Sequence, residues 1–151
     1  MTTIIADAKR GIMVADSRVT TYSSLANYSS DKLYRHGKSI FGEQGDVETG
    51  LRFRRWILDG QPKKGRPVFG DGTDDKFTAL ELAPDGLWLW DFTLNRQRLL
   101  DEVFSTGSGS MIALYCVRVL GKTLEEAIIE AAKIDIHTAE PVQVMRLDEA
   151  K

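Results

Sequence analysis

The sequence predicts an α+β protein in which antiparallel sheets pack against helices. The first observation is the order of the expected elements, which is strands, one helix, strands, two helices and a last strand. The second is that short apolar runs are joined by tight turns containing glycine, a pattern typical of hairpins. The length of 151 residues suits one domain with a sizeable core, so we expect residues 1–151 to form a single domain.

Two apolar runs, residues 3–6 and 12–15, flank Lys9-Arg10-Gly11 and predict a hairpin. Their near-continuous apolar character indicates strands that are buried on both faces, as in the middle of a layered domain. The second strand leads directly into the charged segment Asp16-Ser17-Arg18. Residues 20–31 are rich in Ser, Thr and Tyr with little periodicity, so we expect an ordered surface loop there.

Residues 32–35 and 38–41 predict a second hairpin around His36 and Gly37. We therefore interpret His36 as a turn residue rather than a catalytic base. Neither of the two histidines has a second His or a Cys at ligand spacing, so the sequence gives no support for metal chemistry.

The first helix is expected over residues 47–58, after Asp46, which is a good N-cap. Residues 59–62 end this helix, and residues 63–75, with three glycines and one proline, predict a loop. The residues expected to form the apolar stripe of the helix are Val47, Leu51, Ile57 and Leu58.

The rest of the chain follows the same rules. The capping box of Thr123 and Glu126 marks the start of one helix, and Gly121 ends the helix before it. In order, the expected elements are a hairpin of residues 77–82 and 87–90, a strand of 96–104, helices of 111–120 and 123–133, and a last strand of 142–145.

Composition excludes several classes of protein. The formal net charge is −2, and the short basic cluster at residues 63–66 is typical of a solvated loop. We therefore expect no nucleic-acid partner. The single cysteine, Cys116, rules out an internal disulfide framework and is expected to be a buried, inert thiol. No apolar stretch approaches the roughly 18 residues of a membrane span, and no signal peptide is apparent. We expect a cytoplasmic protein without a membrane partner.

The start of the chain carries a candidate nucleophile. Aminopeptidases remove an initiator Met when the next residue is small, and removal of Met1 leaves Thr2 with both a hydroxyl and a free α-amine. An α-amine has a pKa of about 7.7–8.0, so part of it is unprotonated near neutral pH and can act as a base. A threonine activated by its own N-terminal amine is a recognised nucleophile and base pair.

Six segments in this chain resemble, in the same order, the motifs of the proteasome β-subunit family, which includes the HslV-type peptidases. They are Thr2-Thr3-Ile4, residues 11–18 ending in Asp-Ser-Arg, Lys32-Leu33, residues 41–45, Gly107-Ser108-Gly109-Ser110, and residues 135–138 before a strand over 142–147. Each segment alone is ordinary, and the order of all six carries the resemblance. It implies an N-terminal-nucleophile hydrolase fold, an αββα sandwich of two antiparallel sheets between helical layers.

The resemblance also implies roles for site residues. Thr2 would attack an acyl carbon while its α-amine accepts the proton, and Lys32, held by Asp16, would place a positive charge nearby. The Gly45 N–H would stabilise the oxyanion. Ser108, Asp135 and Thr138, the last in place of the family's Ser, would orient the α-amine.

Structural alternatives remain open for each of these residues. Asp16 and Lys32 can form an ordinary strand-end ion pair, Gly45 can be a plain turn residue, and Ser108, Asp135 and Thr138 can simply cap helices. No cofactor is expected. Members of the family commonly bind a structural monovalent cation near the segment that corresponds to residues 135–138, and this sequence neither supports nor excludes such a cation.

The chain departs from the family pattern in three respects. Only residues 47–58 form a helix where the family has two, so one helix layer is expected to be reduced. Asp46 stands where the family has a small residue, beside the expected oxyanion hole. If Met1 is retained, the α-amine of Thr2 is blocked.

These features lead to three functional hypotheses. The first is a threonine peptidase that cuts peptides or unfolded polypeptide in a homo-oligomeric ring, with an ATP-driven unfoldase as a candidate partner. The second is a catalytically inactive assembly subunit of the same fold. The third is a small-molecule amidase of the same nucleophile class.

Overall fold

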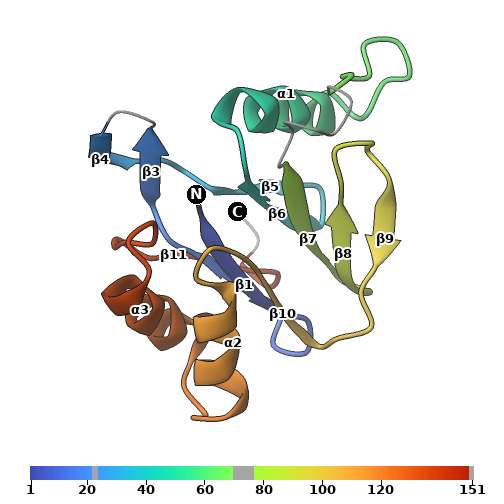
Figure 1. The fold of residues 1–151 in the computed structure, drawn as a ribbon. Helices are drawn as coiled ribbons and strands as arrows, with labels where there is room; N and C mark the ends of the chain where they lie inside the picture. The colour runs from blue at the N-terminus through green and yellow to red at the C-terminus, as the bar shows by residue number, and fades with distance from the viewer. Residues whose placement is uncertain (22–23, 70–76, 150–151) are drawn as a thin grey trace.

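A computed structural model describes residues 1–21, 24–69 and 77–149 (Figure 1). The elements in chain order are β1 (Thr3–Asp7), β2 (Ile12–Ala15), β3 (Arg18–Thr21), β4 (Ser24–Ser29), β5 (Leu33–His36), β6 (Ser39–Gln44), α1 (Val47–Leu58), β7 (Thr78–Ala83), β8 (Gly86–Trp90), β9 (Arg96–Arg98), β10 (Val103–Gly107), α2 (Ser110–Arg118), α3 (Leu124–Ile134) and β11 (Gln143–Arg146). Hairpins and caps therefore lie close to the positions that the sequence predicts.

The first sheet has the antiparallel strand order β10-β1-β2-β11, so β1 has a partner on each side. All residues of β1 and β2 are buried, as their continuous apolar runs predict. Ile5 and Val14 point toward α2 and α3, where they pack with Ala113 and Ile128. These two helices form the lower layer in Figure 1.

The second sheet has the antiparallel order β5-β6-β7-β8-β9. Ile4 and Met13 of the first sheet pack against Ile40, Leu80 and Leu82 of the second sheet, so the two sheets share an apolar core. Alternation along each strand places successive side chains on opposite faces, which lets each sheet contact the other sheet and a helical layer.

The outer face of the second sheet is covered by α1 (Figure 1). The contact is an aromatic cluster in which Phe53 of α1 lies 5.1 Å from Phe77 and 5.7 Å from Trp90, measured between ring centroids. The architecture is therefore an αββα sandwich. Within the described residues α1 is the only helix between β6 and β7, so this layer is reduced as expected.

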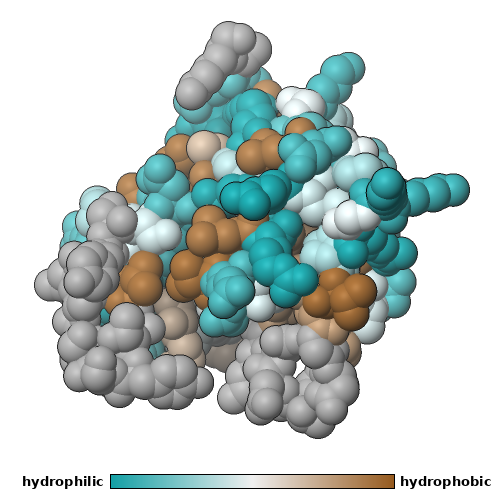
Figure 2. Space-filling model, turned by 90° about the horizontal axis from the view of Figure 1, so that it is seen from above, coloured by the Kyte–Doolittle hydropathy of each residue, from teal (hydrophilic) through white to brown (hydrophobic). Residues whose placement is uncertain are grey.

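The predicted apolar stripe of α1 is wrong for three of its four residues. Val47, Leu51 and Leu58 are exposed, whereas Ile57 is buried as predicted, together with Phe53 and Trp56. Aromatic side chains bury more area than aliphatic ones, so the rotation of the helix follows the aromatic cluster. Seen from the α1 side, the surface mixes hydrophobic and hydrophilic residues (Figure 2).

Two predicted segments differ from the structure. The loop expected at residues 20–31 contains β3 and β4, which pair as a separate two-stranded sheet, while residues 22–23 lie outside the described part of the chain. The register of the β3–β4 pair is irregular, which explains why the sequence shows no alternation of apolar and polar residues there. The single strand expected at residues 96–104 is two strands, β9 and β10, which belong to different sheets.

The helix caps agree closely with the sequence. Asp46 accepts a hydrogen bond from the Thr49 backbone N–H at 2.8 Å, and Thr123 and Glu126 form the predicted capping box. The helix expected at residues 111–120 is α2, which begins at Ser110 and ends at Arg118. The loop predicted for residues 63–75 has no regular structure over 63–69, and residues 70–75 lie outside the described part.

Candidate active site

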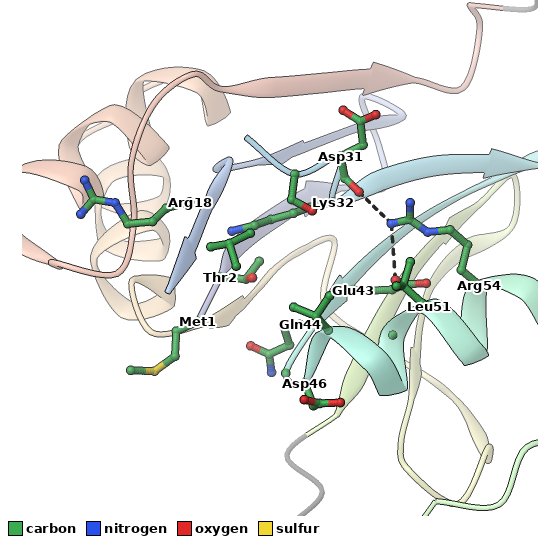
Figure 3. A pocket seen from close by; sticks show the side chains of 15 residues that line it. Met1, Thr2, Arg18, Asp31, Lys32, Glu43, Gln44, Asp46, Leu51 and Arg54 are labelled. Atoms are coloured by element: carbon green, nitrogen blue, oxygen red, sulfur yellow. Dashed lines mark hydrogen bonds and ion pairs between the residues drawn. The ribbon is translucent and has the colours of Figure 1, made fainter. Parts of the chain in front are cut away.

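The start of β1 lies beside a pocket between the two sheets and α1. Figure 3 shows Thr2 next to Lys32, with Met1 at the rim. Thr2 is 6% exposed, and its carbonyl oxygen accepts a hydrogen bond from the Ser108 backbone N–H at 3.1 Å. The strand pairing of β1 with β2 and β10 therefore fixes the position of the candidate nucleophile.

Asp16 and Lys32 form a buried ion pair at this pocket. Lys32 Nζ lies 2.8 Å from Asp16 Oδ1, and Asp16 is fully buried. Asp16 also accepts hydrogen bonds from the backbone N–H groups of Thr3 at 2.8 Å, Arg18 at 2.9 Å and Ala139 at 3.3 Å. The carboxylate is thus held by four donors, which is what a buried negative charge requires.

Two amines at the site have lowered pKa values. Burial lowers the pKa of Lys32, the attraction of Asp16 opposes this effect only in part, and the charge of Arg18 adds to it. Burial, followed by the charge of Lys32, lowers the pKa of the N-terminal amine of Met1. The pocket therefore favours the neutral form of an amine at the start of the chain.

Ser108, Asp135 and Thr138 lie together, although Ser108 follows β10 and the other two follow α3. Asp135 Oδ2 accepts hydrogen bonds from Ser108 Oγ at 2.6 Å and from Thr138 Oγ1 at 2.5 Å. Burial alone would raise the pKa of Asp135, but these bonds and the His137 backbone N–H together hold it below the ordinary value. The carboxylate is therefore stabilised in its charged form.

Thr3 connects this group to the N-terminus. Its Oγ1 lies 2.6 Å from Thr138 Oγ1 and accepts a hydrogen bond from the Gly109 backbone N–H at 2.9 Å. Because the Thr138 hydroxyl donates to Asp135, Thr3 must donate to Thr138. A chain of hydrogen bonds thus runs from Asp135 to the residue that follows the candidate nucleophile.

The glycines of the Gly107-Ser108-Gly109 motif are required by close approach to the N-terminus. A Cβ atom at Gly107, where φ is +102°, would lie 1.7 Å from the Thr2 carbonyl oxygen. At Gly109 it would lie 2.6 Å from Thr3 Oγ1. This spacing explains why the motif appears in the sequence where β10 turns into α2.

Gly45 lines the same pocket as Thr2, with a φ of +114°. The neighbouring Asp46 carboxylate accepts hydrogen bonds from the backbone N–H and the hydroxyl of Thr49. The Asp46 carboxylate therefore caps α1. Thr2 is joined to Met1 by a peptide bond in the described chain, so its α-amine is not free in this form.

Sequence reasoning missed several residues at the site, namely Thr3, Glu43, Arg54 and Gln143. Glu43 lines the pocket, and its Oε2 lies 3.4 Å from the Arg54 guanidinium. Burial raises the pKa of Glu43 to about 7, with the charge of Arg54 opposing the shift. The one available signal was a Glu shortly after the apolar residues Ile40 and Phe41 of a predicted strand. Nothing in the sequence singles out Gln143.

Residues 1–21, 24–69 and 77–149 contain no group of three or more His, Cys, Asp or Glu side chains arranged to hold a metal ion. In the same ranges, no helix has both the length and the apolar character that crossing a membrane demands.

The two sheets and their helical layers define the fold as an αββα sandwich. Eukaryotic HslV from Trypanosoma brucei has this fold with a TM-score of 0.70 and 20% sequence identity, over 96% of this chain and 99% of that chain. Thiobacillus denitrificans BPH matches with a TM-score of 0.69 and 19% identity, over 99% and 100%. BPH in complex with epoxomicin matches with a TM-score of 0.65 and 18% sequence identity, over 98% of this chain and 100% of that chain. No family model and no curated protein sequence matches this chain.

Proposed function

We propose that this chain is a threonine peptidase whose nucleophile is Thr2 after removal of Met1. The observation that carries the proposal is the buried pair of Asp16 and Lys32 next to Thr2. An apolar side chain could pack in that position at a lower desolvation cost, so packing alone does not explain the lysine. The likeness in fold to HslV and BPH supports the same reaction class.

In the proposed reaction, Thr2 Oγ1 attacks the carbonyl carbon of a peptide bond, and its proton moves to the α-amine of the same residue. Collapse of the tetrahedral intermediate breaks the C–N bond, and the leaving amine takes that proton. An ester on Thr2 remains, which water then hydrolyses to release the acid and restore the hydroxyl. The Gly45 N–H is proposed to donate to the intermediate's oxyanion.

Lys32 and the Asp135 group have separate proposed tasks. The Lys32 ammonium favours the neutral α-amine and the developing alkoxide through its positive charge. The hydrogen-bonded group of Ser108, Asp135 and Thr138 orients the α-amine of Thr2 through Thr3. Both tasks are consistent with the low pKa found for an amine at the start of the chain.

We further propose that the protein is a homo-oligomer. Met111 and Tyr115 of α2 and Val119 at its C-cap recur every four residues and are 76%, 54% and 64% exposed. An apolar stripe of this kind is typical of a face that contacts another molecule. A cytoplasmic ring served by an ATP-driven unfoldase is the assembly that fits a peptidase of this class.

Intact mass spectrometry of the untagged protein tests the peptidase proposal. The mass is measured before and after incubation with epoxomicin, which was bound to BPH in a solved structure. We expect the loss of one Met and the addition of one inhibitor, and we expect neither adduct nor peptide cleavage from Thr2→Ala. A chain that keeps Met1 and takes up no inhibitor would instead favour the inactive assembly subunit. Cleavage of simple amides without cleavage of peptides would favour the amidase.

A further inference from the structure

The side-chain amide of Gln143, on β11, makes four hydrogen bonds. Its Oε1 accepts from the backbone N–H groups of Lys32 at 2.8 Å and Leu33 at 3.3 Å. Its Nε2 donates to Ser17 Oγ at 2.8 Å and to the Ser30 carbonyl oxygen at 2.5 Å. A primary amide has two N–H donors and an oxygen with two lone pairs, so every hydrogen-bonding position of this side chain is used.

The partners fix the orientation of the Gln143 amide. The N–H groups of Lys32 and Leu33 can only donate, so they require the amide oxygen. The Ser30 carbonyl can only accept, so it requires the amide nitrogen. A flipped amide would place donors against donors and an acceptor against an acceptor.

These partners lie at the two ends of one excursion of the chain. Ser17 follows Asp16 where the chain leaves the first sheet toward β3, and Ser30 lies two residues before Lys32 where it returns from β4. The two ends are also joined by a hydrogen bond from Ser30 N to Ser17 O at 3.3 Å. Gln143 therefore links by hydrogen bonds the segment that follows Asp16 and the segment that contains Lys32, the two members of the buried ion pair.

We propose that Gln143 is a positioning residue for Lys32, and that its amide fixes the backbone at residues 32 and 33 so that the ammonium stays on Asp16 beside Thr2. The catalytic consequence of this inference rests on the proposed function. The positioning itself is a property of the folded chain and can be measured without any reaction.

The surroundings of Lys32 define what such a measurement will detect. The charged groups that act on its ammonium are Asp16 and Arg18, and it acts in turn on the N-terminal amine. Burial is the main reason that the pKa of Lys32 is low. Releasing its backbone admits water, so the pKa of Lys32 should rise toward the ordinary value of about 10.4.

The first experiment is a titration of Lys32 by its ¹³Cε chemical shift in lysine-labelled protein. Lys32→Arg identifies the resonance. Gln143→Met keeps the length of the side chain and removes all four hydrogen bonds, and Gln97→Met on the exposed strand β9 is the matched control. We expect a raised pKa of Lys32 in Gln143→Met and the parent value in Gln97→Met.

A second variant covers the case in which Gln143→Met does not fold. Ser17→Ala removes one partner of the Gln143 amide and leaves the bonds to Lys32 and Leu33 in place. We expect a smaller change of the Lys32 pKa in the same direction. A folded Gln143→Met with the parent pKa, or a Ser17→Ala with the parent pKa where Gln143→Met cannot be purified, overturns the inference.

The second experiment measures the rate of covalent labelling of Thr2 by epoxomicin in protein that has lost Met1. Unpaired N–H groups at Lys32 and Leu33 should slow the inactivation step by about 10- to 100-fold with little change in the inhibitor's initial affinity. Labelling of Gln143→Met at the parent rate overturns the catalytic consequence. If the parent itself is not labelled, the proposed function fails, and the Lys32 titration still decides the role of Gln143.

Discussion

The ammonium of Lys32 and the carboxylate of Asp16 meet at 2.8 Å, and both side chains are buried. The second carboxylate oxygen of Asp16 accepts from the backbone N–H groups of Arg18 and Ala139. A single side chain thus joins β2, the start of β3, the segment before β5 and the segment before β11. Disturbing it should affect both folding and the site.

Asp16→Asn should reduce the free energy of unfolding by about 3–5 kcal/mol, because one partner of a buried ion pair is left without compensation. The new amide N–H₂ would also face backbone donors. Chemical denaturation at neutral pH measures the effect. Asp148→Asn, at an exposed position, is the control. A loss below about 1 kcal/mol would mean that the pair behaves like an exposed salt bridge.

Glu43→Gln should stabilise the protein at pH 8. The pKa of Glu43 in the folded protein is about 7, above the ordinary value of 4.5. A raised pKa means that the group's contribution to stability is complete below pH 4.5 and is lost as the pH rises through 7. Replacing the ionisable group removes that loss.

Thermal unfolding across pH 4 to 8 tests this prediction. We expect the melting temperature of Glu43→Gln to exceed that of the parent most at pH 8 and to converge with it near pH 4. Glu102→Gln, at an exposed position, should follow the parent curve. A constant difference at every pH would show that titration of Glu43 is not the cause.

Asp135→Asn should remove part of the acid sensitivity of the protein. The pKa of Asp135 is held below its ordinary value of 3.8, so the carboxylate contributes stability above that pH. The contribution is lost as the pH falls below 3.8 and through the lower pKa of the folded state. We therefore expect the variant to be less stable than the parent at pH 6, with the difference shrinking toward pH 3 in denaturant titrations.

Gly107→Ala should displace Thr2 and reduce the free energy of unfolding by about 3 kcal/mol or more, because the added methyl group overlaps the Thr2 carbonyl oxygen. Gly37→Ala is a matched control, since Gly37 also has a positive φ but nothing lies within 4 Å of its added Cβ. It should lose only about 1–2 kcal/mol. Equal losses for the two variants would assign the whole effect to backbone conformation.

The parts of the structure that could be predicted from the sequence are those fixed by local chemistry. The β1–β2 hairpin follows from two apolar runs around Gly11, and α1 and α3 begin where Asp46 and Thr123 can cap them. The predicted site residues lie near one another because each is at the end of an element or in the loop that follows or precedes it. Their catalytic roles remain predictions.

The features that could not be predicted depend on distant parts of the chain. Gln143 gains its partners because β11 pairs with β2 and the chain returns from β4 beside it. The rotation of α1 follows from Phe77, just before β7, and Trp90 of β8, which both come later in the chain. No local pattern around Gln143 or Leu51 contains that information.

The flanking of β1 by β2 and β10 has a practical consequence for protein production. Thr2 is held at the start of a strand with neighbours on both sides, and Met1 ahead of it lines the pocket, so an N-terminal extension begins at the pocket. On the proposed function, an affinity tag at the N-terminus would occupy the space proposed for the substrate and would keep the α-amine of Thr2 blocked. Preparations intended for assays should carry no residue before Thr2.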